Sequence, residues 1–333
     1  MSFIRHFCQR FVFLIISCSL PAIAAPAIPG VTARIRIMDD YMIVVPVTIN
    51  GSGPYDLLLD TGSNNTMLDE KLADELALRR GHEDAVVRVW GSLATSAVYA
   101  ESFSIAGATV AGKDLTLFTC AMIPGLPPKL RGILGEDFLQ KFDILIDYKH
   151  QLIRLDPPPG LMSEMLKGER LTIQLNGMIS GEPTFGRLVV TGRVGDLGTS
   201  SMSLLLDSGS RYLTLFRDDL GLGSAREIVM DSSRPPGSSK AIRLETRTVR
   251  SLMLGRTEIS NILVIAVAGK QRPDVDGLMP TSLFRSIFIS HQGRFVVLNP
   301  SFSRTLAADR SNGLARATAI PPDFTEPLPQ TSR

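Results

Sequence analysis

Short apolar segments with many β-branched residues dominate the sequence from residue 33 onward. Ile35 and Ile37 alternate with arginines, and residues 42–49 are rich in valine and isoleucine, as is typical of β-strands. Residues 50–54 contain the glycine and proline that mark a turn. Residues 68–76 instead place leucines at helical spacing, which predicts a short helix. The pattern therefore indicates short strands, turns and at least one helix.

One of these apolar runs ends in an acid. Leu57-Leu58-Leu59 continues directly into Asp60-Thr61-Gly62-Ser63. Three consecutive apolar residues predict a strand that is buried on both faces. A carboxylate at the end of such a strand is costly to remove from water, so it needs partners or a chemical task.

The same pattern returns in the second half of the chain. Leu204-Leu205-Leu206 continues into Asp207-Ser208-Gly209-Ser210. A lone Asp-Thr-Gly sequence is well explained as a type I turn or a helix N-cap. Two copies that each follow an apolar run are not explained in this way, and they indicate a paired function.

A second duplicated segment follows each motif at nearly the same distance. It is Gly132-Ile133-Leu134-Gly135 after Asp60 and Gly277-Leu278-Met279-Pro280 after Asp207. This spacing supports an internal duplication of the chain. The second copy has lost the last glycine, which leaves open how the loop of Asp207 is supported from behind.

The paired apolar-apolar-Asp-(Thr/Ser)-Gly motifs resemble the signature of pepsin- and retropepsin-like aspartic proteases, here of an exported bacterial type with two tandem lobes. The resemblance covers roughly residues 33–300 and is strongest at the two motifs and at residues 132–147. It implies an all-β fold of two similar β-barrel-like lobes with an active-site cleft between them. The expected organisation is an N-terminal lobe at 33–156, a linker at 157–168 and a C-terminal lobe at 169–300.

The resemblance also implies the catalytic residues, Asp60 and Asp207. In this family two carboxylates in contact share one proton, because two neighbouring negative charges are not both stable. One acid takes a proton from the attacking water while the other protonates the carbonyl oxygen. We therefore expect the two acids to titrate as one unit.

Six neighbouring residues are expected to support this pair. Two glycines would let the loops approach, two hydroxyl groups would cross to the opposite loop, and two further serines would donate to the outer carboxylate oxygens. These residues are, in that order, Gly62 and Gly209, Thr61 and Ser208, and Ser63 and Ser210. Local turn capping remains an alternative for all four hydroxyl groups.

Members of this family close a β-hairpin flap over the substrate, and the hairpin follows the first motif. Residues 86–104 fit such a hairpin, with a break at Gly91 and Ser92. Trp90 lies beside this break, so it is either a flap residue or an ordinary half-buried strand aromatic. The polar loop at residues 231–240 occupies the corresponding place in the second half.

The composition is that of an ordinary globular protein. The chain has 333 residues, enough for two domains, with 44% hydrophobic and 20% charged residues. A formal net charge of +2 gives no indication of a nucleic-acid partner. The four histidines are scattered without metal-ligand spacing, so we expect no metal and no cofactor.

The N-terminus has the pattern of an export signal, predicted at residues 1–24. Arg5 and Arg10 precede an apolar core, and Ala22-Ile23-Ala24 resembles a cleavage site. We therefore expect a periplasmic or secreted protein, with lipoprotein processing at Cys18 as an alternative. The apolar run is too short for a membrane anchor, and no other segment predicts a transmembrane span.

Two further segments carry structural expectations. Cys120 would be the single cysteine of an exported chain and lies in an apolar stretch, which favours a buried packing thiol over a nucleophile. Residues 301–333 are proline-rich with little apolar periodicity and are predicted to be a disordered tail.

The function expected from the resemblance is that of a monomeric exported endopeptidase acting on peptides or unfolded proteins. A non-catalytic peptide-binding protein that retains the fold is the first alternative. In a second alternative, the catalytic pair forms between two copies of the chain.

Overall fold

The computed structural model describes residues 30–302, except for several short internal segments. The segments outside the description are 89–90, 116, 122, 124–125, 158–165, 175–176, 180–181, 185–186, 199, 218–225, 231–241 and 268–274. The predicted signal peptide at 1–24, with the alternative site at Cys18, therefore lies outside the described residues. So do Trp90, the polar loop at 231–240 and most of the predicted tail.

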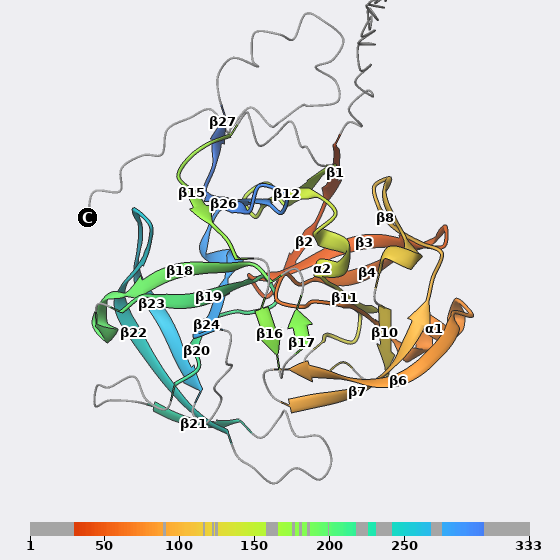
Figure 1. Ribbon diagram of the computed structural model, residues 1–333, viewed down its shortest axis with the longest axis horizontal. Helices are drawn as coiled ribbons and strands as arrows, with labels where there is room; N and C mark the ends of the chain where they lie inside the picture. The colour runs from red at the N-terminus through yellow and green to blue at the C-terminus, as the bar shows by residue number, and fades with distance from the viewer. Residues whose placement is uncertain are drawn as a thin grey trace, which may run out of the picture.

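The described chain is almost entirely β-structure (Figure 1), which confirms the all-β prediction. The strands up to residue 156 are β1 (Val31–Arg34), β2 (Arg36–Met38), β3 (Met42–Ile49), β4 (Ser52–Leu59), β5 (Thr66–Asp69), β6 (Arg79–Arg88), β7 (Gly91–Tyr99), β8 (Ser102–Ile105), β9 (Ala108–Ala111), β10 (Leu117–Cys120), β11 (Gly132–Leu134), β12 (Asp143–Asp147) and β13 (Leu152–Asp156). The later strands are β14 (Leu166–Lys167), β15 (Arg170–Thr172), β16 (Gly177–Ile179), β17 (Glu182–Thr184), β18 (Val189–Val194), β19 (Met202–Asp207), β20 (Leu213–Leu215), β21 (Arg226–Met230), β22 (Ile242–Leu254), β23 (Thr257–Val267), β24 (Gly277–Pro280), β25 (Ser286–Ser290), β26 (Phe295–Leu298) and β27 (Ser301–Phe302). The helical segments are α1 (Glu70–Glu75), η1 (Gly112–Asp114), α2 (Glu136–Leu139), η2 (Gly195–Leu197) and η3 (Thr281–Leu283).

The first lobe is built on a ten-stranded sheet of order β6-β7-β10-β5-β11-β4-β3-β8-β9, with β2 paired to β3. The strand that carries Leu57–Leu59, β4, lies between β3 and β11, and all three leucines are buried, as predicted. The predicted helix exists as α1 but is shorter than expected. Asp69 ends β5 and caps the helix by accepting a hydrogen bond from the Leu72 amide at 2.7 Å.

The second lobe is built on a seven-stranded sheet of order β18-β19-β24-β20-β23-β22-β21. Strand β19, which ends in Asp207, pairs in parallel with β24, as β4 pairs in parallel with β11. Likewise β20 pairs in parallel with β23, as β5 does with β10. Two similar barrel-like sheets are thus present, in agreement with the predicted fold class.

A third sheet joins the two lobes, and the sequence did not reveal it. Its order is β1-β13-β12-β25-β26-β15, so each half of the chain supplies three strands. The central strands β12 and β25 are antiparallel, with Leu145 opposite Phe288. Figure 1 shows this sheet at the top, between the first lobe on the right and the second on the left.

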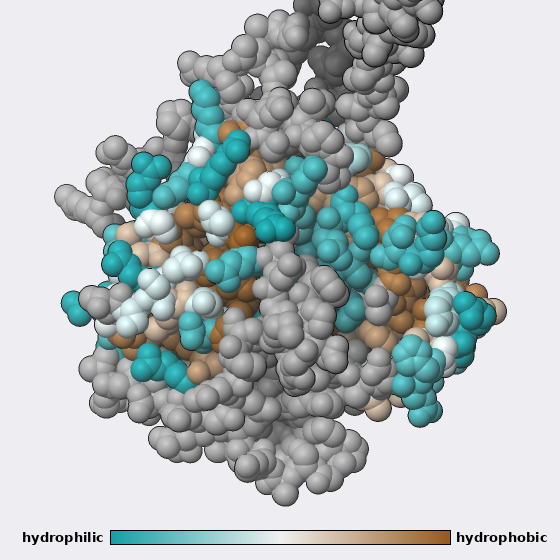
Figure 2. Space-filling view, in the orientation of Figure 1, coloured by the Kyte–Doolittle hydropathy of each residue, from teal (hydrophilic) through white to brown (hydrophobic). Residues whose placement is uncertain are grey.

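The apolar core is continuous through both lobes and the joining sheet. One cluster of buried residues includes members of all three sheets, among them Leu59, Ile146, Leu206 and Ile289. On the face drawn in Figure 2, polar side chains are interspersed with apolar ones over both lobes. Among the described residues, no helix combines the length and the hydropathy needed to cross a bilayer.

The structure corrects three predicted boundaries. The first strand, β1, begins at Val31, before the predicted start of the N-terminal lobe at residue 33. The predicted linker at 157–168 contains β14, which pairs with β27 at the start of the predicted tail. These segments form strands because each finds a partner for its backbone groups far away in the sequence.

Cys120 lies in a small apolar cluster with Met67, Phe118 and Ile123, and its side chain is buried. This position agrees with the predicted packing role.

Candidate active site

The two Asp-(Thr/Ser)-Gly motifs follow β4 and β19 and interlock. The Thr61 amide donates to Ser208 Oγ at 3.0 Å, and Thr61 Oγ1 donates to the Leu206 carbonyl at 2.9 Å. The second loop reciprocates, since the Ser208 amide donates to Thr61 Oγ1 at 3.1 Å and Ser208 Oγ donates to the Leu59 carbonyl at 2.8 Å. Thr61 and Ser208 are each only 1% exposed, so these bonds form away from water. The interlock fixes the relative position of the two loops.

The glycines allow each acid to pack against the opposite loop. A Cβ atom on Gly62 would lie 2.6 Å from Cγ of Asp207, and one on Gly209 would lie 2.8 Å from Cγ of Asp60. No side chain fits at such distances. The two glycines therefore permit the approach that brings both carboxyl groups to the junction of the loops, close enough for each to alter the pKa of the other.

Backbone amides hold the carboxylates. The Gly62 amide donates to Oδ1 of Asp60 at 2.9 Å, and the Gly209 amide donates to Oδ1 of Asp207 at 2.8 Å. The prediction that Ser63 and Ser210 donate their hydroxyl groups to the outer carboxylate oxygens was wrong.

The two serine hydroxyl groups instead cap their own turns. Ser63 Oγ donates to the Asn65 carbonyl at 2.9 Å, and Ser210 Oγ donates to the Tyr212 carbonyl at 3.0 Å. In each loop the carbonyl two residues ahead is within reach of the hydroxyl, so the turn-capping alternative holds for these serines.

The environment raises the pKa of both acids but not equally. Burial raises the pKa of Asp60, while hydrogen bonds from Gly62, Asp207 and other groups oppose that increase. Burial raises the pKa of Asp207 as well, and the charge of Asp60 and the hydrogen bond to it raise it further, to well above the usual range. Each acid therefore influences the ionisation of the other.

The segment behind Asp60 is a hydrogen-bonded support. The Asp60 amide donates to the Leu134 carbonyl at 3.0 Å, which ties the loop to β11. The next residue, Gly135, donates its amide to Thr66 Oγ1 at 3.1 Å, and that hydroxyl donates to Asp137 Oδ1 at 2.7 Å.

The segment behind Asp207 lacks the hydrogen bonds that support the Asp60 loop through Gly135 and Thr66. Strand β24 pairs with β19 so that Met279 is opposite Leu206 and Pro280 is opposite Asp207. Pro280 has no amide hydrogen, and Leu213, which begins β20 as Thr66 begins β5, has no hydroxyl. The amide donor and the hydroxyl acceptor are therefore both absent from the second lobe. Neither group is left buried without a hydrogen-bond partner. The missing glycine therefore does not remove the strand behind Asp207.

The predicted flap region is a β-hairpin of β6 and β7. Arg88 pairs with Gly91 and Val87 with Ser92, so both residues of the predicted break belong to β7. The prediction placed the turn too late, because this register leaves residues 89–90 as the connection. Trp90 itself is outside the described residues.

Three residues near Asp207 were not predicted as part of the site. The Arg211 guanidinium lies 5.9 Å from the centre of the Tyr41 ring and 5.5 Å from that of the Tyr212 ring. Burial raises the pKa of Tyr41, and the charges of Asp39 and Asp207 add to the increase. Arg211 and Tyr212 directly follow the second motif in the sequence, and this position could have indicated that they belong to the site. No feature of the sequence indicated that Tyr41 belongs to it.

No group of three or more histidine, cysteine, aspartate or glutamate side chains is arranged to hold a metal ion in the part of the chain that the structure describes.

The interlock predicts a specific loss of stability. Thr61→Val keeps the side-chain shape but leaves the Leu206 carbonyl and the Ser208 amide without partners. The free energy of unfolding, measured with urea, should fall by about 1–3 kcal/mol for each unpaired group. Ser210→Ala is the matched control and should cost less than about 1 kcal/mol, because its hydroxyl only caps a turn. Equal losses in the two variants would contradict the interlock.

The raised pKa values predict how stability varies with pH. Both acids bind protons more tightly in the folded state than in the unfolded state, so their contribution is present below the unfolded value near 3.8 and is lost as pH rises through the folded values. Asp207→Asn removes the part of this dependence that belongs to Asp207, the acid with the larger increase. Its free energy of unfolding relative to the wild type should therefore grow as pH rises from about 4 to 7. A difference that stays constant with pH would contradict the shared proton.

Comparison with known proteins finds one family that is similar to part of the first lobe. Residues 45–138 match the family described as aspartyl protease. A solved structure of a retropepsin-like aspartic protease from Rickettsia conorii is 17% identical, covers 38% of this chain and 92% of that chain, and has a TM-score of 0.30. No curated protein matches the chain significantly. Residues 45–138 thus resemble the aspartyl proteases, over less than half of the chain.

Proposed function

We propose that this protein is an aspartic endopeptidase that hydrolyses peptide bonds with a water molecule activated by Asp60 and Asp207. The observation that carries the proposal is the interlock of the two loops, which brings the buried Asp207 and the half-buried Asp60 together within one chain. Both motifs contribute one acid and one crossing hydroxyl group. A purely structural pair of turns would not require two acids to lie side by side and partly removed from water.

We propose different roles for the two acids. Asp60 is ionised and takes a proton from water as the water oxygen bonds to the peptide carbonyl carbon. Asp207 gives its proton to the carbonyl oxygen, which yields a neutral tetrahedral intermediate. As the C–N bond breaks, Asp60 passes its proton to the departing nitrogen and a hydroxyl of the intermediate returns a proton to Asp207. The resting protonation state is restored.

The substrate is an extended peptide or unfolded protein segment held between the lobes. The hairpin of β6 and β7 is the flap in this proposal, with Trp90, Gly91 and Ser92 as its substrate-contacting residues. An extended backbone can pair with strand-like protein segments while its side chains occupy separate pockets.

The cellular setting follows from the N-terminal pattern. The protein is exported to the periplasm or secreted, with residues 1–24 removed or, in the alternative, with Cys18 acylated. It acts as a monomer, because one chain supplies both acids.

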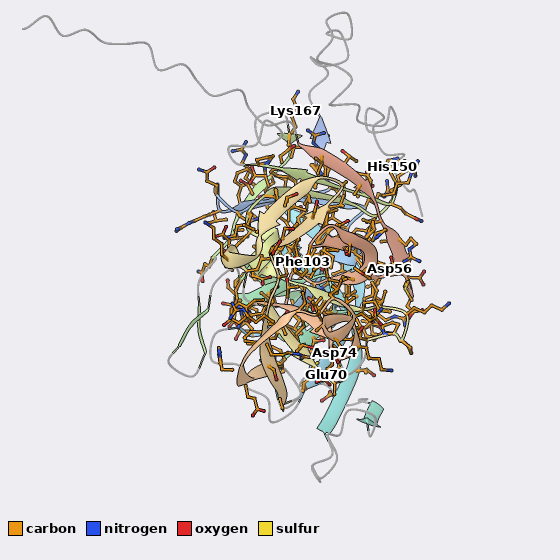
Figure 3. All side chains as sticks on the ribbon, turned by 90° about the vertical axis from the view of Figure 1, so that its right-hand side faces the viewer. Asp56, Glu70, Asp74, Phe103, His150 and Lys167 are labelled. Carbon is orange, nitrogen blue, oxygen red and sulfur yellow. The ribbon has the colours of Figure 1, made fainter. Side chains whose placement is uncertain are left out.

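The central prediction concerns the two acids. Asp60→Asn and Asp207→Asn should each lower kcat/KM for peptide cleavage by about 10³-fold or more, and the double variant should be no worse, because a shared-proton pair acts as a unit. Asp56→Asn is the matched control on the same strand. Asp56, labelled in Figure 3, has a side chain that is 41% exposed and pairs with Arg36, so this variant should keep full activity.

The pattern of activities separates the alternatives. A wild-type protein that binds a statine-type transition-state analogue but cleaves nothing would be the non-catalytic peptide-binding protein. Activity that survives Asp207→Asn but not Asp60→Asn would indicate a pair formed between two copies of the chain. Normal cleavage by both variants would overturn the protease proposal.

The flap can be tested with the single tryptophan of the chain, Trp90. Its fluorescence should change when a statine-type peptide binds, because an aromatic residue at a closing flap moves between water and a contact with the ligand. The titration should follow the same binding curve as calorimetry. Calorimetric binding with no change in fluorescence would remove Trp90 from the flap.

A further inference from the structure

A buried acid–base pair joins the two halves of the molecule behind the Asp60 loop. His291 Nε2 lies 2.8 Å from Oε2 of Glu136, and His291 Nδ1 lies 2.7 Å from the Phe142 carbonyl. Glu136 is 1% exposed and His291 is 4% exposed. Glu136 begins α2 in the first half of the chain, whereas His291 follows β25 in the second.

Glu136 is also bonded to the loop that carries Asp60. The Glu136 amide donates to the Ser63 carbonyl at 2.8 Å, and the next amide, that of Asp137, donates to the Asn64 carbonyl at 3.0 Å. A chain of hydrogen bonds therefore runs from His291 through Glu136 to the residues that directly follow the catalytic motif.

The other side of the molecule has an equivalent pair without charge. Tyr148 follows β12 as His291 follows β25, and Thr281 follows Pro280 as Glu136 follows Gly135. The hydroxyl groups of Tyr148 and Thr281 lie 2.6 Å apart. Each lobe thus reaches behind the other lobe's catalytic loop, with an ionisable pair behind Asp60 and a neutral pair behind Asp207.

The hydrogen bonds define the proton arrangement of the charged pair. The Phe142 carbonyl can only accept, so Nδ1 of His291 carries a hydrogen. Burial opposes a charged imidazole, but the Glu136 carboxylate outweighs it and raises the pKa of His291. Each group thus favours the charged form of the other, and the Glu136 carboxyl group also interacts with Asp60.

Other charged groups face this pair. Asp60 and Asp137 lie near Glu136, and together with burial they raise its pKa, while His291 lowers it. Asp143, on β12, lies near His291 and favours its charged form. The second oxygen of Glu136, Oε1, is buried and accepts no hydrogen bond from the described residues. A buried ionic pair with an unsatisfied oxygen is weak support for stability alone, which points to another role.

We propose that Glu136 and His291 are positioning residues for Asp60, which hold its loop against the opposite lobe and make the surroundings of the two catalytic acids unequal. This inference rests on the proposed peptidase function. A carboxylate behind Asp60 disfavours a second negative charge on the catalytic pair, so it extends the pH range in which the pair keeps its shared proton.

The pH profile of kcat/KM is the first test, measured on the full chain with a fluorogenic peptide chosen from its cleavage products. Glu136→Gln leaves a buried neutral histidine, and His291→Gln leaves a buried acid that takes up a proton, so both remove the negative charge. In each single variant and in the double variant, the decrease of kcat/KM at high pH should occur at a pH lower by about half a unit than in the wild type.

Tyr148→Phe is the matched control. It removes the corresponding hydrogen bond behind Asp207, but burial raises the pKa of Tyr148, so no charge is lost in the working range. Its basic limb should stay in place even if kcat falls. An active wild type whose Glu136→Gln and Tyr148→Phe profiles coincide would overturn the inference, whereas an inactive wild type would overturn the proposed function.

A second measurement needs neither activity nor a change at the pair. Coupling between two sites is reciprocal, so Asp60→Asn should lower the pKa of the His291 imidazole, read by NMR of labelled histidine. His291→Gln assigns the resonance, and Asp56→Asn should leave it unchanged. An unchanged His291 pKa in Asp60→Asn would show that the pair and the acid are not coupled.

Discussion

The structure depends on holding two acids next to each other where both are at least partly removed from water. Neither Asp60 nor Asp207 would adopt this position on its own, because burial penalises each charge and proximity penalises having both. The interlock through Thr61 and Ser208 offsets this cost with four buried hydrogen bonds, and the opposing glycines remove the steric obstacle. The rest of the fold positions these two loops next to each other. The leucine strands β4 and β19 are buried on both faces, and β11 and β24 pair with them in parallel.

Attachment of the lobes to each other matters as much as the loops themselves. The six-stranded sheet combines three strands from each half, and the cross-lobe pairs of Glu136 with His291 and Tyr148 with Thr281 lie next to it in the sequence. A small rotation of one lobe would therefore break contacts in the sheet, in both pairs and in the interlock at once. This arrangement keeps the distance between the two acids within narrow limits, as a shared proton requires.

The sequence predicted the features that repeat or follow a local rule. The duplicated Asp-(Thr/Ser)-Gly motif gave the two loops, the three-leucine runs gave buried strands, and helical spacing gave α1. It failed where the outcome depends on which distant segments pair. Nothing in the local pattern of β12 and β25 reveals that these two strands pair with each other.

In the candidate site, too, the features that follow a local sequence rule were predicted and those that depend on distant contacts were not. The crossing hydroxyl groups of Thr61 and Ser208 have the places that the family resemblance implies, but Ser63 and Ser210 bond to carbonyls two residues ahead, which only the loop geometry decides. The loss of the Gly135 equivalent at Pro280 could not be interpreted alone, because its explanation lies in Leu213 replacing Thr66 on a neighbouring strand. Glu136 and His291 are far apart in sequence, and no local signal joins them.

The shared proton is the central claim, and the carboxyl carbons of the two acids report on it directly. In protein labelled with ¹³C at the aspartate carboxyl groups, Asp60 and Asp207 should show two linked titration steps, the second well above the range of an ordinary aspartate. The step at higher pH should appear mainly in the resonance of Asp207. Two independent titrations close to pH 4, each unaffected by replacing the other acid with asparagine, would show that the acids do not share a proton and would contradict this account.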